Sequence, residues 1–538
     1  MAGITKDVAP IQSAKSAADL APPRAISVAG LRELLAIVLA VALADVTLYR
    51  GAGLAGVAVL LVAGPLLLVL GSPHRRLGVS FWVVSMLLLL LAARMLWLGD
   101  ALAVLIGAAL VVAFALSLRG LRPYVFDVLT SFVQLALAGG VGLQGYLRAA
   151  TGFSPPVSRW FYLSLLLPGG AVVLFGTIFI LANPDLARSL ATNLDRLQQM
   201  LADWLDGMSQ NWLEVGFWIV TAYVVIGLLR PLLTRNVIPD APLASPGEAI
   251  VLFLESPWYG PLRNMLWAVI GLFAVYLSFE FQTLWFRDFP AGFHYSGYAH
   301  EGAAWLTAAL ALATLMLSLI FRGDVLRDPR LGRLRLLAWI WSGLNLLLAL
   351  TVYHRLSIYI DFNGMSRMRT IGLFGISTVV VGFVLVLWKI AQGRGFVWLI
   401  HRQLWALAAA VYLYALTPVD TLVHAYNVRQ ILAGDVAPAV QISVHPISAE
   451  GYLMLEPLVD CDDPIVRDGV RALLAQRAIQ ARRGAAERKA LGWTTWQGSE
   501  YLLAERLAAQ RSQWREFADD AARQAALDRF HKYAYQWY

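Results

Sequence analysis

The sequence predicts an all-α, polytopic transmembrane helix bundle of about eleven or twelve spans, followed by a small helical C-terminal domain. The first observation is composition, since 59% of the residues are hydrophobic and only 14% are charged; soluble domains are about 45–50% apolar and about 25% charged. The second is the repeated alternation of apolar stretches, long enough to cross a bilayer, with short polar connections. The third is the end of this alternation at Leu416, beyond which the chain is polar.

The chain divides into four predicted parts. Residues 1–30 are polar and predict a flexible N-terminal tail, 31–158 an N-terminal transmembrane region, 159–416 a second transmembrane region, and 417–538 a helical domain outside the membrane. The first apolar stretch continues into more apolar sequence without a signal-peptidase site, so we expect it to be retained as a span. The predicted spans are Leu34–Leu48, Ala55–Leu70, Phe81–Leu98, Leu102–Leu118, Val125–Leu143, Trp160–Ala182, Leu213–Leu229, Leu262–Leu284, Ala303–Phe321, Leu334–Val352, Thr370–Lys389 and Phe396–Leu416.

The distribution of Lys and Arg favours one orientation only if one apolar segment does not cross. With twelve crossings, the basic residues are shared about equally between the two sides, which contradicts the positive-inside rule. Val125–Leu143 is the best exception because it is interrupted by polar residues and glycines, namely Asp127, Ser131, Gln134, Gly139, Gly140 and Gly142. If it is re-entrant or interfacial, eleven crossings place the N-terminus in the cytoplasm and the C-terminal domain outside. A span missed or added elsewhere would give the same parity.

Two polar regions also show helical patterns. In 185–206, leucines recur at steps of three and four among aspartates, which predicts an amphipathic helix. Because it is acidic, we expect it to pack on the protein's own spans rather than on anionic lipid. In the C-terminal domain, Asp463 followed by Pro464 predicts the start of a helix towards Ala485. A second helix begins at about Ser499, with Leu503, Leu507, Gln510, Trp514 and Phe517 on one side.

The last residues are rich in aromatic side chains, Phe530, Tyr533, Tyr535, Trp537 and Tyr538. Such a cluster either packs on the preceding helix or lies at the membrane interface, and the sequence leaves both open.

Several classes of site have no support in the sequence. Cys461 is the only cysteine, which excludes an intramolecular disulfide and a cysteine-based metal cluster. The net charge of +8 comes mostly from Lys and Arg at the ends of spans, so it indicates lipid headgroups and not nucleic acid. His300 and Glu301 lack the second histidine of a zincin motif, and neither a P-loop nor a dinucleotide fingerprint is present. We therefore predict no metal, no cofactor and no catalytic residues.

Three stretches of the chain carry a recurring pattern of tyrosine, glycine, arginine and asparagine. The residues are Tyr295, Tyr298 and Gly302 at the start of one span, Tyr359, Gly364 and Arg369 at the start of another, and Asn427 at the start of the C-terminal domain. In this pattern the chain resembles, over about Trp160–Leu474, the bacterial membrane proteins grouped as domains of unknown function 4153 and 4173. The resemblance implies an integral inner-membrane protein of bacterial type, without an activity to carry over.

One set of polar residues is a candidate site. On the predicted outer side, Glu301, Asp361 and Arg369 are expected to line one polar pocket, with Tyr298 and Tyr359 as its walls. The alternative is that these residues are helix caps and headgroup anchors.

Three functions follow from these features. The first is a non-enzymatic envelope or accessory protein that interacts with another membrane or envelope protein. The second is a transporter of a small or lipidic solute, because broken helices with glycines, such as Gly139, Gly140 and Gly142, often build transport sites. The third is a membrane-embedded glycosyltransferase-like enzyme, for which Asp45 beyond the first span would be a base or metal ligand; an ion pair of Asp45 with Arg50 is the simpler interpretation.

Overall fold

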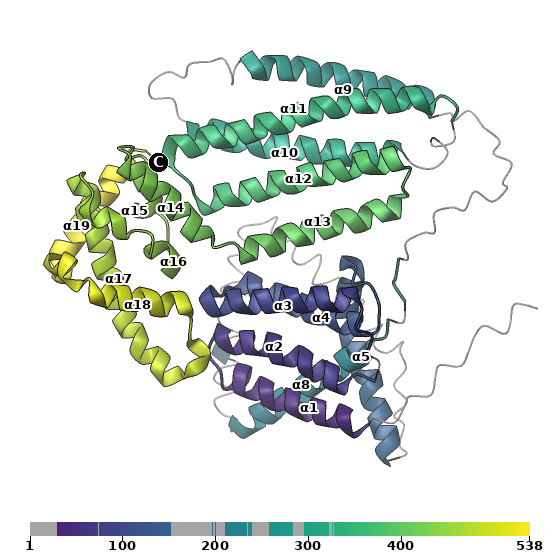
Figure 1. Ribbon diagram of the computed structural model, residues 1–538, viewed down its shortest axis with the longest axis horizontal. Coiled ribbons are helices and arrows are strands. Elements are labelled where there is room, and N and C mark those ends of the chain that lie inside the picture. The colour runs from purple at the N-terminus through teal and green to yellow at the C-terminus, as the bar shows by residue number, and fades with distance from the viewer. Residues whose placement is uncertain are drawn as a thin grey trace, which may run out of the picture.

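The computed structural model describes residues 30–73, 75–151, 210–233, 235–238, 258–282, 295–321 and 328–537, with positions 196, 199, 200 and 325. Its helices form two groups that lie side by side, and a smaller helical domain covers one end of both (Figure 1). The predicted all-α bundle is therefore confirmed. The predicted N-terminal tail, the span Trp160–Ala182 and, apart from three positions, the amphipathic helix 185–206 lie outside the described residues.

The predicted spans that fall on described residues are all helical. The first group contains α1 (Leu31–Ala44), continued by the π-helix η1 (Asp45–Tyr49), with α2 (Leu54–Gly71), α3 (Val79–Leu98), α4 (Ala101–Leu118), α5 (Val125–Thr151) and α8 (Gln210–Leu229). The second contains α9 (Tyr259–Glu280), α10 (Tyr295–Ile320), α11 (Leu331–Asn363), α12 (Arg367–Gln392) and α13 (Phe396–Leu416). Within the described residues, nine helices are long and apolar enough to cross a membrane. The chain is a multi-pass membrane protein.

The surfaces of these helices are as apolar as their interiors. Each group has its own buried core, with Leu88 and Leu91 in the first and Leu317 and Trp341 in the second. Large apolar side chains also lie outside, such as Val275, which is 71% exposed. Such a surface is unfavourable in water and matches hydrocarbon, which explains why these helices are hydrophobic all round.

The two ends of the bundle can be told apart by their contacts. At one end, which we call the arginine face, Arg230 after α8 pairs with Glu33 of α1 at 2.7 Å. At the same face, Lys389 near the end of α12 donates to the carbonyl of Phe321, just after α10, at 3.0 Å. The opposite end carries the C-terminal domain, and we call it the domain face (Figure 1). Arg50, just after η1, pairs there with Glu214 of α8.

Helix α5 does not run from one face to the other. Near its start, Asp127 accepts from the backbone N–H of Val237, which follows α8, at 2.8 Å. Near its other end, the hydroxyl of Tyr146 donates to Glu33, and the guanidinium of Arg230 lies 4.6 Å from the Tyr146 ring centre. Both ends of α5 therefore contact the arginine face, and Figure 1 shows α5 crossing the direction of α2, α3 and α4.

The glycines of α5 serve close packing. The helix is unbroken from Val125 to Thr151, so the broken helix that motivated the transport interpretation is not found there. A Cβ at Gly139 would lie 2.7 Å from the carbonyl oxygen of Tyr223, and one at Gly142 would lie 2.4 Å from a methyl carbon of Ile226. These glycines let α5 cross closely over α8.

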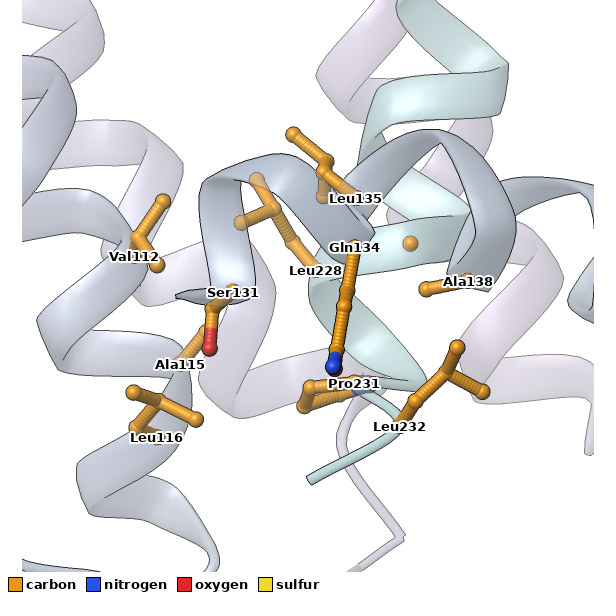
Figure 2. A pocket seen from close by; sticks show the side chains of 11 residues that line it. Val112, Ala115, Leu116, Ser131, Gln134, Leu135, Ala138, Leu228, Pro231 and Leu232 are labelled. Atoms are coloured by element: carbon orange, nitrogen blue, oxygen red, sulfur yellow. The ribbon is translucent and has the colours of Figure 1, made fainter. Parts of the chain in front are cut away.

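A small cavity remains where α4, α5 and α8 meet. Figure 2 shows Val112, Leu116, Ser131, Gln134 and Leu232 around it. Its volume is about 10 Å³, which is room for about one water molecule. The Ser131 hydroxyl is the buried polar group that would bind such a water. The cavity is too small for an organic solute.

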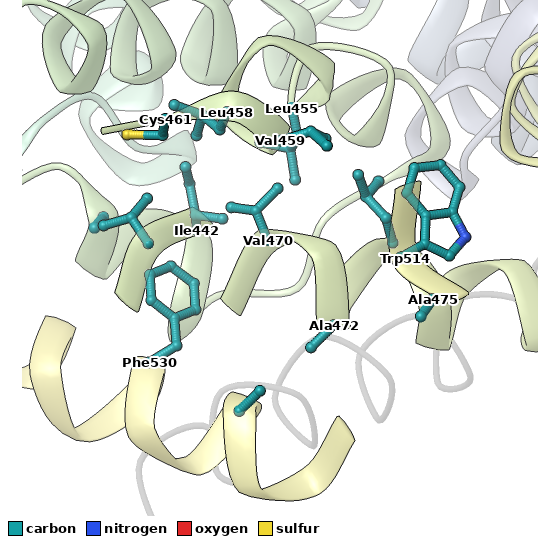
Figure 3. Packing of buried hydrophobic residues seen from close by; sticks show 14 of the residues in the cluster. Ile442, Leu455, Leu458, Val459, Cys461, Val470, Ala472, Ala475, Trp514 and Phe530 are labelled. Atoms are coloured by element: carbon teal, nitrogen blue, oxygen red, sulfur yellow. The ribbon is translucent and has the colours of Figure 1, made fainter. Parts of the chain in front are cut away.

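The C-terminal domain has a core of its own. Its main helices are α14 (Val419–Leu432), α17 (Pro464–Leu491), α18 (Gly498–Ala509) and α19 (Asp520–Tyr535). Short helices connect them, namely α15 (Ala439–Ser443), α16 (Ala449–Tyr452), η4 (Glu456–Asp460), η5 (Trp493–Thr495) and η6 (Arg511–Ala518). Figure 3 shows Ile442, Val470 and Phe530 towards one side of this core and Trp514 with Ala475 towards the other. The predicted N-cap is present, because the Asp463 carboxylate accepts from the N–H groups of Ile465 and Val466.

Three aromatic residues near the C-terminus belong to or pack against this core, namely Phe530, Tyr533 and Trp537, whereas Tyr535 is exposed. Phe530 is 1% exposed, and a Cβ at Gly469 of α17 would collide with its ring. Tyr533 donates to Asp463 at 2.8 Å. Of the two alternatives that the sequence left open, packing on the domain's own helices is therefore the one found for Phe530 and Tyr533.

The domain also contacts the first group directly. The hydroxyl of Thr494 in η5 accepts from the N–H of Ala52 at 3.2 Å. A Cβ at Gly53 would lie 2.3 Å from the carbonyl oxygen of Thr494, so the turn between η1 and α2 needs glycine to admit η5. The C-terminal domain is thereby fixed to the start of the chain as well as to its second half.

Candidate functional site

The turn between α11 and α12 is where residues from distant parts of the chain converge. Helix α11 ends at Asn363, and Gly364 follows with φ +86° and ψ −178°, a conformation that is essentially restricted to glycine. Ser366 then caps α12, since its side chain accepts from the N–H of Arg369. This turn projects from the domain face towards α14.

Asn427 of α14 holds this turn by two hydrogen bonds. Its side-chain oxygen accepts from the N–H of Met365 at 2.7 Å, and its side-chain amide donates to the carbonyl of Met365 at 2.9 Å. Asn427 is completely buried. The side-chain amide of Gln441 also donates a hydrogen bond to the carbonyl of Asn363 at 3.0 Å. The backbone of the turn is thus bound to the C-terminal domain. A side-chain amide such as that of Asn427 suits this role because it can donate and accept a hydrogen bond at the same time.

Arg369 closes the turn from the bundle side. Its guanidinium donates to the carbonyl of Gly364 and to the side-chain oxygen of Asn363. The same guanidinium lies 3.8 Å from the ring centre of Tyr359, within the range of a cation–π interaction. Arg369 is 5% exposed. It stabilises the end of α11, because it donates to the carbonyl of Gly364 just after the helix and to the side chain of the last helical residue, Asn363.

The predicted outer pocket is only partly assembled by described residues. Tyr359 and Arg369 do lie together. Asp361 is exposed on the same helix and accepts from the hydroxyl of Tyr426 at 3.2 Å. Tyr298 and Glu301 belong to the first turns of α10, but their side chains lie outside the described residues. The five-residue pocket therefore stays a prediction.

Ion pairs at the edges of this junction tie the domain to both groups of helices. Glu450 of α16 accepts from Arg94 of α3 at 2.7 Å and from the indole N–H of Trp97 at 3.0 Å. Asp420 of α14 pairs with Arg367 at the start of α12. Glu450 is 2% exposed and Asp420 is 4% exposed, so each carboxylate depends on its partner for stabilisation.

The electrostatics around Asp420 follow from these partners. Burial alone would raise the pKa of Asp420, but hydrogen bonds from Arg367 and from Ser448 outweigh it, so the pKa lies below its usual range. One turn further along α14, His424 is 3% exposed. Burial lowers the pKa of His424 to about 4, and the imidazole is neutral at pH 7.

Asp45 is occupied by neighbouring donors. Its carboxylate accepts from the indole N–H of Trp218 at 2.9 Å and pairs with Arg50 at 2.9 Å. These contacts match the ion pair that the sequence indicated as the simpler interpretation. Within the described ranges, no group of three or more His, Cys, Asp or Glu side chains is arranged to hold a metal ion.

The family described as Domain of unknown function (DUF4153) matches residues 78–456. The chain belongs to this family. The DUF4153 match begins earlier than the resemblance in the sequence indicated, at the start of α3, and it ends at η4. It therefore contains both partners of the Arg94–Glu450 and Arg367–Asp420 pairs and the whole junction around Gly364. No curated protein and no solved structure gave a match to the chain.

Sequence reasoning found some of these DUF4153 residues and missed others. Tyr359, Gly364, Arg369 and Asn427 were named as a pattern, and the structure places all four at one junction. Glu450 was missed because its partner Arg94 lies 356 positions away, and no spacing rule connects residues so far apart. A buried junction held by hydrogen bonds and ion pairs of this kind provides a rigid connection between the domain and the bundle.

His424 makes this junction sensitive to acid, and we expect its stability to fall between about pH 6.5 and pH 4. In the unfolded chain His424 binds a proton near pH 6.5, whereas in the folded protein its pKa is about 4. The unfolded state therefore binds more protons in this window, so stability is complete above it and declines as the pH falls. The loss is about 3 kcal/mol in total. Thermal unfolding measured from pH 7.5 to pH 4 checks this.

The control for this prediction is the variant His424→Gln, which has no titrating group at that position. It is expected to unfold with a flatter pH dependence than the parent, whatever its stability at pH 7.5. His445 also has a pKa lowered by burial and by Arg369 and Arg367, so His445→Gln is measured in parallel. An equally steep pH profile in His424→Gln would contradict the assignment to His424.

Proposed function

We propose that this protein is a non-enzymatic component of the bacterial inner membrane that holds its C-terminal domain outside the cytoplasm as a fixed platform for another envelope protein. The observation that carries the proposal is the buried junction, which ties the domain to α3 by Glu450 and to α12 by Asp420. A domain that moved during a transport or catalytic cycle would not need buried ion pairs to both halves of the bundle. A rigid connection suits a protein that presents a surface.

The orientation in this proposal is supported by the charges at the two faces. Among the described residues, the basic ones at the arginine face include Arg32, Arg75, Arg76, Arg119, Arg122, Arg230, Arg235, Arg330, Arg333, Arg335 and Arg394, whereas those on the bundle near the domain face include Arg50, Arg94, Arg355, Arg367 and Arg369. Cytoplasmic connections carry the excess of Lys and Arg. The arginine face would then be cytoplasmic and the C-terminal domain external.

The path of the chain agrees with this orientation. Both ends of α5 contact the arginine face. The chain therefore enters and leaves α5 at the same face of the bundle. Helix α8 starts at the domain face, where Glu214 meets Arg50, and α13 also ends there, next to α14. This supports the interfacial interpretation of Val125–Leu143 and the parity of eleven crossings.

A cysteine-accessibility experiment tests the orientation. The lone Cys461 is buried, and the variant Cys461→Ala gives a cysteine-free parent. One single cysteine is then introduced by Tyr501→Cys on the domain, where Tyr501 is 63% exposed. The other is introduced by Gly78→Cys between α2 and α3, where Gly78 is exposed and a Cβ would meet nothing within 4 Å. A membrane-impermeant maleimide should label the first in intact cells and the second only after the membrane is opened. The reverse pattern would refute the proposed orientation.

A crosslinking experiment tests the platform itself. A photoreactive amino acid is placed at Tyr501 or at Arg515, both exposed on the domain, and as a control at Leu105, which is 68% exposed on the lipid-facing side of α4. We expect one discrete protein adduct from the domain positions, absent from the control and reduced by Glu450→Gln. Protein adducts that are equally abundant at all three positions, or none at the domain positions, would contradict a platform.

A further inference from the structure

Two connections on the arginine face together form a compact basic corner. The backbone N–H of Arg76, between α2 and α3, donates to the carbonyl of Leu118 at the end of α4 at 3.0 Å. The side chain of Arg76 packs over Gly120, where a Cβ would lie 2.6 Å from its Cδ and where φ is +79°. This contact brings Arg75 and Arg76 next to Arg119 and Arg122 of the α4–α5 connection.

Two arginines of this corner, Arg76 and Arg119, have no ion pair with a carboxylate among the described residues. Asp127 accepts from Asn236 and Val237, and Glu33 is occupied by Arg230 and Tyr146. Arg119 instead lies near a second cation, Arg230, and burial together with that cation lowers the pKa of Arg119. A corner with this excess of charge favours an anion.

The outer side of α5 beside this corner is apolar. Its exposed side chains follow a helical stripe, with Phe126 at 40%, Leu129 at 57%, Val133 at 67%, Leu143 at 41% and Leu147 at 40% exposure. This helix crosses the direction of α2, α3 and α4 (Figure 1), and both of its ends contact the arginine face, which would place it near the membrane surface. An apolar helix face at that depth is what an interfacial helix presents to lipid.

The α2–α3 connection and the start of α3 also carry exposed aliphatic side chains, Leu77 at 56% and Val79 at 81% exposure. They lie directly after Arg75 and Arg76 in the chain. The corner therefore combines arginines with exposed aliphatic side chains, which is the complement of a lipid with a charged headgroup and apolar tails.

We propose that this corner binds an anionic phospholipid, whose phosphate and charged headgroup contact Arg76 and Arg119 and whose acyl chains lie against the outer stripe of α5. Basic clusters beside transmembrane helices recognise such headgroups, with about 1 kcal/mol for each arginine or lysine near the surface. A zwitterionic lipid would lack the net charge that matches the corner. The inference concerns a lipid site and does not depend on the platform proposed above.

The test uses the full-length protein, purified in an uncharged detergent and titrated with phosphatidylglycerol or phosphatidylcholine. Phosphatidylglycerol is expected to raise the thermal midpoint of unfolding, and phosphatidylcholine is not. In the double variant Arg76→Gln/Arg119→Gln, the apparent affinity for phosphatidylglycerol should fall roughly tenfold to thirtyfold. The matched control is Arg482→Gln/Arg483→Gln on α17, where both arginines are exposed.

Two further measurements test the proposal if the glutamine variant is unstable. Arg76→Lys/Arg119→Lys retains the charge and should retain most of the affinity, and native mass spectrometry counts bound lipid directly. Equal effects of the two lipids would overturn the proposal. So would an equal loss in the Arg482/Arg483 control, or a stabilisation by inorganic phosphate as large as that by phosphatidylglycerol, which would indicate a site for free anions.

Discussion

The variant Glu280→Ala is expected to lose about 3–5 kcal/mol of stability, the cost of leaving a buried cation without its partner. Glu280 ends α9, and its two oxygens accept from Arg355 of α11 at 2.6 and 2.8 Å. The side chains of Glu280 and Arg355 are 1% and 6% exposed, so water cannot replace the missing carboxylate. Unfolding of the purified protein in detergent, followed by its thermal midpoint, measures the effect.

The double variant Glu280→Leu/Arg355→Met separates the ion pair from packing. Replacing both members of a buried pair by apolar residues is often nearly neutral, so the double variant should be more stable than Glu280→Ala. If both variants unfold at the same temperature as the parent, the ion pair does not contribute to stability. If the double variant is the less stable one, the two residues act through other contacts.

The variant Gly364→Ala should disrupt the junction between the bundle and the C-terminal domain. The backbone at Gly364 has φ +86°, which costs a non-glycine residue on the order of 1–3 kcal/mol. The new Cβ would also lie 2.5 Å from the side-chain oxygen of Asn427 and 2.8 Å from Pro438. Asn427 would have to move and lose its hydrogen bonds to Met365. We expect faster proteolysis between α13 and α17 and a lower thermal midpoint.

Gly375→Ala is the matched control, in the middle of α12. A Cβ there meets nothing within 4 Å, and alanine favours a helix over glycine by about 1 kcal/mol. This control should be as stable as the parent or slightly more stable. Similar proteolysis of Gly364→Ala and Gly375→Ala would show that the turn is not held as the hydrogen bonds to Asn427 indicate.

The sequence predicted features that depend on neighbouring residues. The lengths of the apolar stretches located the membrane helices, and the Asp463–Pro464 pair located the start of α17. Both signals come from residues that are neighbours in the sequence. Of the predicted side of the second helix, Leu503, Leu507, Trp514 and Phe517 are buried and Gln510 is half-buried, but α18 ends at Ala509, and Trp514 and Phe517 lie in η6. Charge counting indicated that one segment does not cross, and the polar residues and glycines of Val125–Leu143 made it the best exception; which segment this is stays a prediction.

Features that depend on tertiary contacts could not be predicted. Arg94 and Glu450 meet across 356 positions, and nothing near Arg94 in the sequence marks it as a partner. The role of the α5 glycines was also misjudged, since glycine permits a break and a close crossing alike, and only the position of Tyr223 decides between them. For Phe530, burial in the domain core settled what aromatic composition alone could not.

The contact between Thr494 and the turn after η1 has a consequence for biogenesis. Its two partners, Ala52 and Thr494, are separated by 442 positions. The first membrane helices are therefore synthesised and inserted long before the residue that clamps them exists. Until Thr494 has been synthesised, the turn between η1 and α2 lacks this contact, whereas Glu450, which comes earlier in the chain, can already pair with Arg94 of α3. The contact is therefore among the later ones to form, and a truncation that removes Thr494 would destabilise the turn between η1 and α2, more than 400 positions away in the chain.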